Sequence, residues 1–81
     1  MYDRIVVGTD LSKTARVATD RAAGLARRLE AELYLVHAGR DPGDEFAKLA
    51  ADYGGTPVVA AGNPAEVLLA ETERLDADLL V

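Results

Sequence analysis

Hydrophobic residues occur along the chain in two patterns that alternate. Short β-branched or leucine-rich runs predict strands at Arg4–Gly8, Leu33–His37, Val58–Ala61 and Ala77–Val81. Between these runs, apolar residues recur with the 3.6-residue spacing of a helix that buries one side. The order is strand, helix, strand, helix, strand, helix, strand, with short connections. The pattern predicts an α/β fold in which helices flank an open, Rossmann-like parallel sheet.

The three helices are predicted from their ends and their apolar stripes. The first follows Ser12, and the second runs from Asp44 to the glycines at 54 and 55, because glycine often follows a helix end. The third starts with Asn63 as its cap and Pro64 as its first helical residue. The residues expected to face the core are Ala18, Ala22, Leu25, Ala26 and Leu29 in the first helix, Phe46, Leu49, Ala50 and Tyr53 in the second, and Leu68, Leu69, Thr72 and Leu75 in the third.

Composition points to one small globular domain. The 81 residues are 49% hydrophobic and 28% charged, which is an ordinary globular balance. The chain has no cysteine, so disulfides and thiolate metal sites are excluded, and a cytoplasmic location is expected. No stretch approaches the roughly 20 apolar residues that span a bilayer, and the amino terminus is too polar for a signal peptide. We therefore expect no membrane partner.

Charge argues against a nucleic-acid partner. The net charge is −5, whereas binding a polyanion requires a concentrated basic face. Several arginines share the first helical segment with acids spaced among them, including pairs four residues apart. These residues are Arg16, Arg21, Arg27 and Arg28 with Asp20, Glu30 and Glu32. The spacing favours a solvated helix face.

The candidate binding site is Gly8-Thr9-Asp10, directly after the first strand. Ligands of open parallel sheets bind beyond the carboxyl ends of the strands. Glycine allows a ligand to approach the backbone closely, Thr9 offers a hydroxyl, and the Asp10 carboxylate could accept from a ribose hydroxyl or help to hold a metal ion. The alternative is that Asp10 and Ser12 only satisfy the free amides at the start of the first helix.

Other signatures of nucleotide binding or catalysis are missing from the sequence. Neither the G-x-x-x-x-G-K-[ST] loop nor a G-x-G-x-x-G after the first strand is present. His37 is the single histidine, and its position at the end of an apolar strand favours a packed, hydrogen-bonded side chain over a metal ligand or general base. Asp76 and Asp78 are two residues apart at the polar start of a strand, where we expect solvated side chains. No catalytic residue is assigned.

Three segments resemble the universal stress protein family. They are the opening strand and turn at Tyr2–Ser12, the strand Ala31–Ala38 that contains Leu-Val-His, and Gly62-Asn63-Pro64-Ala65-Glu66 leading to Asp76–Val81. The resemblance implies a five-stranded parallel sheet in the order 3-2-1-4-5. This chain would then be a single incomplete domain, residues 1–81, with strand order 3-2-1-4 and without the fifth strand.

The resemblance also implies a ligand. Many members of the family bind ATP, and others have lost that capacity. Gly8, Thr9 and Asp10 match positions on the adenosine side of the pocket, and Ala38 matches a position, usually valine, that packs near the base. The family holds the phosphates with a Gly-x-x-Gly, spacer, Gly-[Ser/Thr] stretch after the fourth strand, and no residue here matches it. We therefore expect ATP, with or without Mg²⁺, to require that stretch.

Three functions follow from these observations. The first is a universal stress protein-like domain in the stress response that binds ATP or a related adenine nucleotide when complete. The second is an interaction module that does not bind nucleotide and acts by dimerisation, since the sheet would have an open hydrophobic edge at its fourth strand. The third, an ATPase or phosphotransferase, lacks a placed base, nucleophile or metal cluster.

Overall fold

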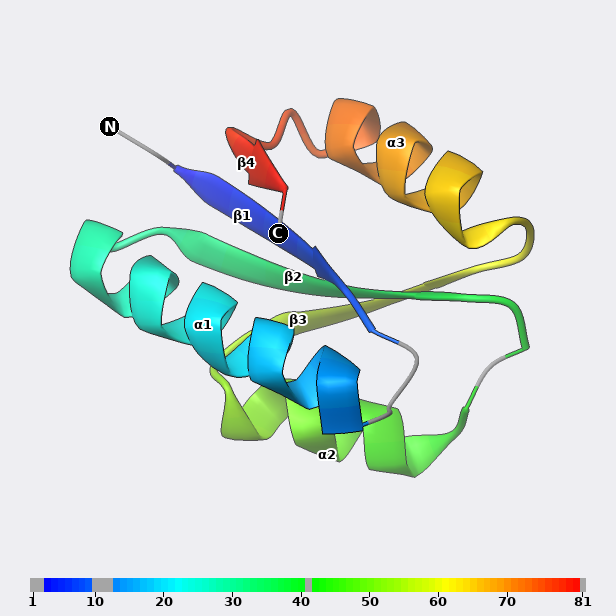
Figure 1. Cartoon of the computed structure of the whole chain (residues 1–81), viewed down its shortest axis with the longest axis horizontal. Coiled ribbons are helices and arrows are strands. Elements are labelled where there is room, and N and C mark those ends of the chain that lie inside the picture. Colours follow the sequence, from blue (N-terminus) through cyan, green and yellow to red (C-terminus); the bar gives the residue numbers. More distant parts are fainter. Residues whose placement is uncertain (1–2, 10–12, 41, 81) are drawn as a thin grey trace.

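The computed structural model describes residues 3–9, 13–40 and 42–80. Its elements follow in the order β1 (Arg4–Gly8), α1 (Lys13–Leu29), β2 (Glu32–Ala38), α2 (Asp44–Asp52), β3 (Thr56–Ala60), α3 (Pro64–Arg74) and β4 (Leu79–Leu80). The paired strands are parallel, in the order β3-β2-β1-β4. Figure 1 shows α1 and α2 on one side of the sheet and α3 on the other. The predicted parallel α/β fold is confirmed.

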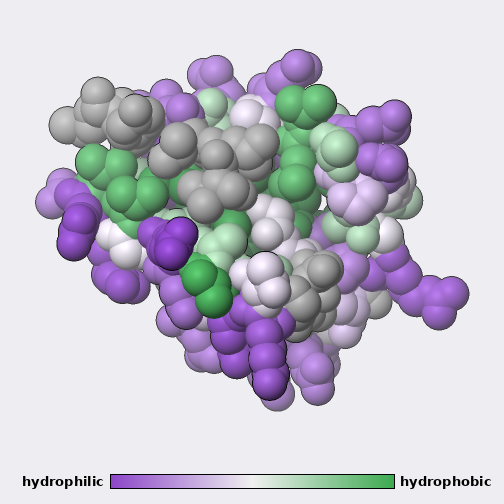
Figure 2. Space-filling model, in the orientation of Figure 1, coloured by the Kyte–Doolittle hydropathy of each residue, from purple (hydrophilic) through white to green (hydrophobic). Residues whose placement is uncertain are grey.

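The core lies in two layers because alternate residues of each strand point to opposite faces of the sheet. Ile5, Val6 and Val7 are fully buried, as predicted for a strand covered on both faces. Ile5 and Val7 belong to the layer under α1 and α2, whereas Val6 belongs to the layer under α3. Figure 2 shows the molecule from the same side as Figure 1, with hydrophilic residues around much of the visible surface and apolar residues between them in separate patches.

The α3 side of the sheet has the thinner layer of buried side chains. Three buried residues, Val6, Val36 and Val67, form this cluster, and its remaining members are only partly buried. Among the residues whose burial is described, the other face holds nine buried ones, including the large ring of Phe46. This difference follows from the number of helices, since one helix covers the first face and two cover the second.

Two expected core positions are wrong. In α3 the buried residue is Val67, while Leu69 is 60% exposed. In α1 the buried positions are Thr19, Ala22, Ala23 and Ala26, and Leu25 is exposed. The other apolar positions of the predicted stripes pack on the core, namely Ala18, Ala22, Ala26 and Leu29 in α1 and Leu68 and Leu75 in α3. For α3 the cap fixes the start, because the Asn63 side chain accepts hydrogen bonds from the amides of Ala65 and Glu66 as predicted.

The loop residues 10–12, which include the predicted cap Ser12, lie outside the described residues. So do residues 1–2, 41 and 81. Among the helices that are described, none is both long and apolar enough to cross a bilayer.

The α3 packing gives a direct test. Val67→Ala removes buried apolar volume and is expected to lower the free energy of unfolding by about 2 kcal/mol. Leu69→Ala is the matched control, and its effect is expected to stay within about 0.5 kcal/mol because the side chain is exposed. Urea denaturation followed by circular dichroism measures both. A larger loss for Leu69→Ala than for Val67→Ala would contradict the observed orientation of α3.

Candidate functional site

The carboxyl ends of β1 and β2 lie side by side. Gly8 pairs with Val36 in the parallel register, and the Thr9 amide donates a hydrogen bond to the Val36 carbonyl oxygen at 3.0 Å. Thr9 is 8% exposed, so the backbone just beyond β1 remains packed against the sheet. The structure therefore brings Gly8 and Thr9 to the edge where ligands of parallel sheets bind.

Ala38 lies at the same edge, two residues beyond the partner of Gly8. It ends β2 and pairs with Ala60 of β3, and the next amide, that of Gly39, donates to the Ala60 carbonyl oxygen at 2.8 Å. Its side chain is half-buried against the cluster under α3. Three of the four predicted site residues thus share one end of the sheet. Asp10, the fourth, lies outside the described residues, and binding by any of the four stays a prediction.

Gly8 has a packing role that the sequence analysis did not predict. A Cβ atom at this position would lie 2.8 Å from Cδ1 and 2.9 Å from Cδ2 of Leu68 in α3. The missing side chain therefore makes room for α3 to lie close to the end of β1. Glycine at position 8 is explained by this helix-to-sheet contact, whether or not a ligand also approaches the backbone there.

His37 packs as predicted, but its hydrogen bonding differs from the expectation. Its ring meets Phe46 edge-on, with centroids 5.8 Å apart and planes at 72°. The expected hydrogen bond is not seen at Nδ1, because this buried atom has no partner among the described residues. The histidine thus contributes an aromatic contact between β2 and α2 at the carboxyl edge of the sheet.

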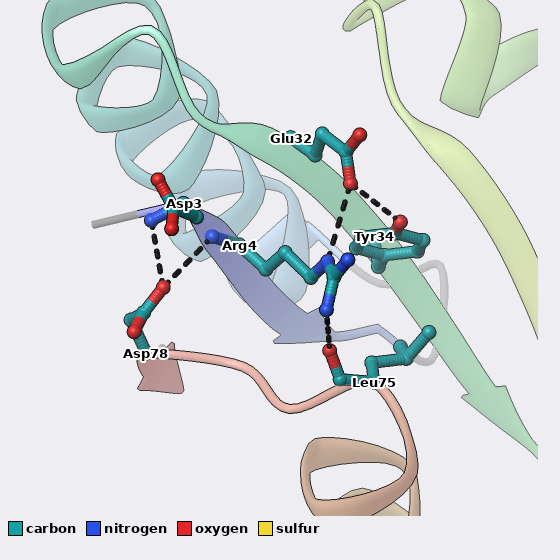
Figure 3. A network of polar contacts seen from close by, with 6 residues as sticks. All are labelled: Asp3, Arg4, Glu32, Tyr34, Leu75 and Asp78. Atoms are coloured by element: carbon teal, nitrogen blue, oxygen red, sulfur yellow. Dashed lines mark hydrogen bonds and ion pairs between the residues drawn. The ribbon is translucent and has the colours of Figure 1, made fainter. Parts of the chain in front are cut away.

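A denser polar network lies at the opposite, amino edge of the sheet (Figure 3). The Asp78 carboxylate accepts hydrogen bonds from the backbone amides of Asp3 and Arg4, at 2.6 and 3.1 Å. The Arg4 guanidinium donates to the carbonyl oxygen of Leu75 at 2.8 Å and lies 3.4 Å from the Glu32 carboxylate. Arg4 therefore joins the starts of β1 and β2 to the end of α3.

This network corrects the expectation for Asp78. Its carboxylate is exposed, yet it is not simply solvated, because it holds the first amides of β1. Those two backbone hydrogen bonds lower the pKa of Asp78 below its ordinary value of 3.8, since they favour the charged form. Asp76 takes a left-handed conformation with φ of 51°, so the two acids do not form a catalytic pair on one strand.

A repeated sequence pattern could have revealed this edge. Leu29-Glu30-Ala31-Glu32-Leu33 and Leu75-Asp76-Ala77-Asp78-Leu79 share the order leucine, acid, alanine, acid, leucine. The first acidic residue of each segment has a left-handed backbone conformation, with φ of 54° at Glu30 and 51° at Asp76. The alanine amide then donates to a carbonyl oxygen five residues back, at 2.9 Å in both. The same turn thus ends α1 and α3 and leads into the two strands that flank β1.

The amino edge also contains a cleft of about 550 Å³. It is lined by five acids and one arginine, namely Asp3, Arg4, Glu30, Glu32, Asp76 and Asp78. Within the described parts of the chain, no group of three or more His, Asp or Glu residues is arranged to hold a metal ion. The cleft is therefore an acidic surface feature of the fold.

These features define an α/β domain with a parallel sheet and a candidate site at its carboxyl edge. The model of the Universal stress protein family matches residues 1–57, which is more than half of the chain. The chain belongs to the universal stress protein family. A search of the curated proteins gives no match.

Several solved structures have the same fold. A universal stress protein in complex with cAMP is 21% identical with a TM-score of 0.82, and the match covers 98% of this chain and 74% of that one. A universal stress protein from Archaeoglobus fulgidus DSM 4304 is 24% identical with a TM-score of 0.84, covering 96% and 31%. A family member from Burkholderia pseudomallei is 24% identical with a TM-score of 0.72, covering 98% and 79%. At such identities the likeness concerns the fold.

The contact between Gly8 and Leu68 can be tested by a double-mutant cycle. Gly8→Ala is expected to lower the free energy of unfolding by about 1–2 kcal/mol, because the new methyl group meets the Leu68 side chain. In a Leu68→Ala background the same change should cost less than about 0.5 kcal/mol, because the obstructing atoms are gone. Urea denaturation of the four proteins gives the coupling energy. Additive effects would contradict the proposed reason for glycine.

The Asp78 network predicts an acid-dependent stability. Because the folded pKa of Asp78 lies below the unfolded value, its contribution is present above about pH 3.8 and is lost as pH falls through the lower folded value. Asp78→Asn should therefore reduce the melting temperature by a constant amount above pH 5, and the difference should shrink below pH 3.8. Thermal melts between pH 7 and pH 2.5 measure this. A difference in melting temperature between the wild type and Asp78→Asn that grows below pH 3.8 would contradict the stabilising role of the Asp78 carboxylate.

Proposed function

We propose that this chain is the adenosine-binding part of a universal stress protein domain that functions in the stress response. The observation that carries the proposal is the juxtaposition at the carboxyl edge. The Thr9 amide, just beyond Gly8, donates to the Val36 carbonyl oxygen of β2. Val36 is two residues before Ala38, and the family resemblance places Ala38 near the base. The related structure in complex with cAMP supports an adenine ligand.

The proposed pocket has an apolar and a polar side. Ala38 lies on the face of the sheet under α3, where it contacts the cluster around Val36 and Val67. A planar base could pack against such a surface, and small side chains leave room for it. Thr9 follows the end of β1, where its amide is bonded to the Val36 carbonyl oxygen, and its hydroxyl is proposed to face the ligand. Asp10 is proposed as the acceptor for the ribose hydroxyls.

Phosphate binding requires groups that these 81 residues do not supply. Phosphates are usually held by backbone amides of glycine-rich loops and by helix amino termini. No Gly-x-x-Gly stretch occurs after β4 in the sequence. The chain should therefore recognise the adenosine moiety, and ATP, with or without Mg²⁺, would bind fully only to a domain that includes such a stretch. We assign no catalytic step, and cytoplasmic localisation stays a prediction.

We also propose that this domain has the strand order 3-2-1-4. The order is supported by the pairing of Ile5 with Leu79 and of Val6 with Leu80. In the five-stranded order 3-2-1-4-5 that the family resemblance implies, the fifth strand would lie beside β4.

The alternative function, an interaction module that dimerises, is favoured by the difference between the two sheet edges. The Ala60 carbonyl oxygen accepts from the Gly39 amide just beyond β2, so the main-chain groups of Thr56, Val58 and Ala60 face β2, and those of Pro57 and Val59 face outward. Proline has no amide hydrogen, so Val59 is the one outward-facing donor of β3. Strand pairing between copies would therefore favour the β4 edge.

Adenosine binding is tested by NMR titration of the ¹⁵N-labelled chain. Adenosine should shift the amide signals of Gly8, Thr9, Ala38 and Gly39, while those of Glu32 and Asp78 at the other edge stay in place. ATP should bind no more tightly than adenosine, because the phosphates gain no contacts here. Ala38→Glu should abolish the shifts, Ala38→Val should keep them, and Ala61→Glu at an exposed nearby position is the control for added charge. Shifts confined to the amino edge, or none at millimolar adenosine, would contradict the proposal.

A further inference from the structure

We propose that the outer side of α1 binds an acidic helix of a partner protein. The contact surface is the outer stripe of α1, which consists of Lys13, Val17, Arg21, Gly24 and Arg28. This inference adds a second binding surface to the molecule and does not depend on the proposed function.

The outer stripe faces away from the sheet. Its residues are separated by four, four, three and four positions, so they follow one side of the helix for about 22 Å. The buried residues of α1 lie on the opposite side, namely Thr19, Ala22, Ala23 and Ala26. Figure 1 shows α1 and α2 next to each other on one side of the sheet, so α2 covers a flank of α1 and leaves its outer side open.

Helix α1 concentrates positive charge in an acidic protein. It contains five basic residues and one acid, a formal net charge of +4, whereas the whole chain has −5. Arg16 and Arg27 lie toward α2, where each lines a cleft together with Asp52. The three basic residues of the outer stripe are exposed, and the stripe contains no acid. The outer stripe is therefore the positive surface of the helix.

The acids expected to balance this charge have other roles. Helix α1 ends between Arg28 and Glu32, so these residues are not one helical turn apart, as their spacing had suggested. Glu32 begins β2, where it forms an ion pair with Arg4. Asp20 accepts a hydrogen bond from the Tyr53 hydroxyl. Within the described part of the chain, no ion pair involves a residue of the outer stripe. The expected balance of charge is therefore wrong for this side of the helix.

Two residues of the outer stripe weaken the helix without a packing reason inside the chain. Glycine and valine favour a helix less than alanine does. A Cβ atom at Gly24 would meet nothing within 4 Å among the described residues, and Val17 is 53% exposed. Gly8 is explained by its contact with Leu68, but Gly24 has no such neighbour. Close approach of a second helix would explain it, because the distance between packed helices depends on the size of the side chains at the contact.

The spacing of charge on the outer stripe points to a helix as the partner. Lys13, Arg21 and Arg28 are eight and seven positions apart, which is about two helical turns in each case. Acids two turns apart on a second helix would face them, and such complementary charges fix the register of an interface. A small or apolar residue between those acids would pack on Val17 and Gly24.

The acidic amino edge of the sheet argues against a flat anionic partner. Glu30 follows Arg28 by two residues, and five acids line the cleft at that edge. A membrane or a nucleic acid would meet these acids together with the outer stripe and would be repelled by them. A single acidic helix can lie along the outer stripe and end before Glu30.

Fluorescence anisotropy tests the proposal with a fluorescein-labelled helical peptide as the probe. The probe has glutamate at every seventh position, leucine on the same side, and alanine and glutamine elsewhere. It should bind in 50 mM NaCl, and its dissociation constant should rise about tenfold or more in 500 mM NaCl, because salt screens exposed charges. A probe with glutamine in place of every glutamate should bind far more weakly. In ¹⁵N NMR spectra, the acidic probe should shift the amides of α1 and leave those of Ala38 and Asp78 in place.

Charge variants locate the binding surface. Arg21→Gln with Arg28→Gln should raise the dissociation constant about tenfold or more, because two complementary contacts are lost. Lys48→Gln with Arg74→Gln is the matched control, since it removes the same charge at exposed positions of α2 and α3, and it should leave binding unchanged. Circular dichroism confirms folding of every variant.

A glycine variant separates binding from stability. Gly24→Gln should raise the melting temperature of the free chain, because glutamine favours a helix more than glycine does. It should also raise the dissociation constant about tenfold, because the new side chain blocks the close approach. Ala47→Gln is the control, since it enlarges a side chain at an exposed position of α2, and binding should not change.

Three results would overturn the proposal. The first is no change in anisotropy with the chain at millimolar concentration in 50 mM NaCl. The second is equal binding of the glutamine probe, or equal binding of the acidic probe to Gly24→Gln and to the wild type. The third is tighter binding to phosphatidylserine vesicles than to the acidic probe, which would favour a membrane surface.

Discussion

The structure depends on the burial of β1 on every side. Ile5, Val6 and Val7 have no exposed surface, so their side chains require a helix layer on each face. Their main-chain groups also require a strand on each edge, because a buried amide or carbonyl without a partner costs roughly 1–3 kcal/mol. Both edges are paired, with β2 along the whole strand and with β4 at Ile5 and Val6. The three helices and the strands β2 and β4 can be understood as the covering of this one strand, and β3 extends the sheet beyond β2.

The amino end of β1 is secured by two equivalent connections. Glu32 and Asp78 each follow an acidic residue in the left-handed backbone conformation and then an alanine. The Glu32 amide donates to the Asp3 carbonyl oxygen at 2.8 Å, and the Asp78 amide donates to that of Arg4 at 2.9 Å. Their carboxylates then bind different parts of β1, the guanidinium of Arg4 in one case and the backbone amides in the other. At the carboxyl end of β1, the Thr9 amide is bonded to Val36 and Gly8 packs closely against Leu68. The Arg4 and Asp78 network and the candidate ligand site occupy opposite edges of the sheet.

The order of helices and strands was predictable from sequence, because the spacing of hydrophobic residues follows from which side of each element is buried. The β-branched run at Ile5–Val7 and the Asn63-Pro64 start of α3 depend on local chemistry alone. The orientation of a helix about its axis was not predictable at Leu25 or Leu69, since apolar residues flank the true inward faces on both sides. The edge position of Gly8, Thr9 and Ala38 follows from parallel pairing. The repeated leucine, acid, alanine, acid, leucine order could have located the amino edge, but the partners of Arg4 and Asp78 could not be predicted, because they lie more than 70 positions away.

That separation has a consequence for how the domain folds. The hydrogen bond from the Asp3 amide to Asp78 closes a loop of 75 residues, whereas β1–β2 pairing joins segments separated by one helix. Loop closure costs entropy before the contacts that reward it are made, so high contact order slows folding. The three-stranded unit of β1, β2 and β3 can therefore form ahead of the segment from α3 to β4. Docking of that segment ties Asp78 to the start of β1, and an opening there would expose one edge of this deeply buried strand.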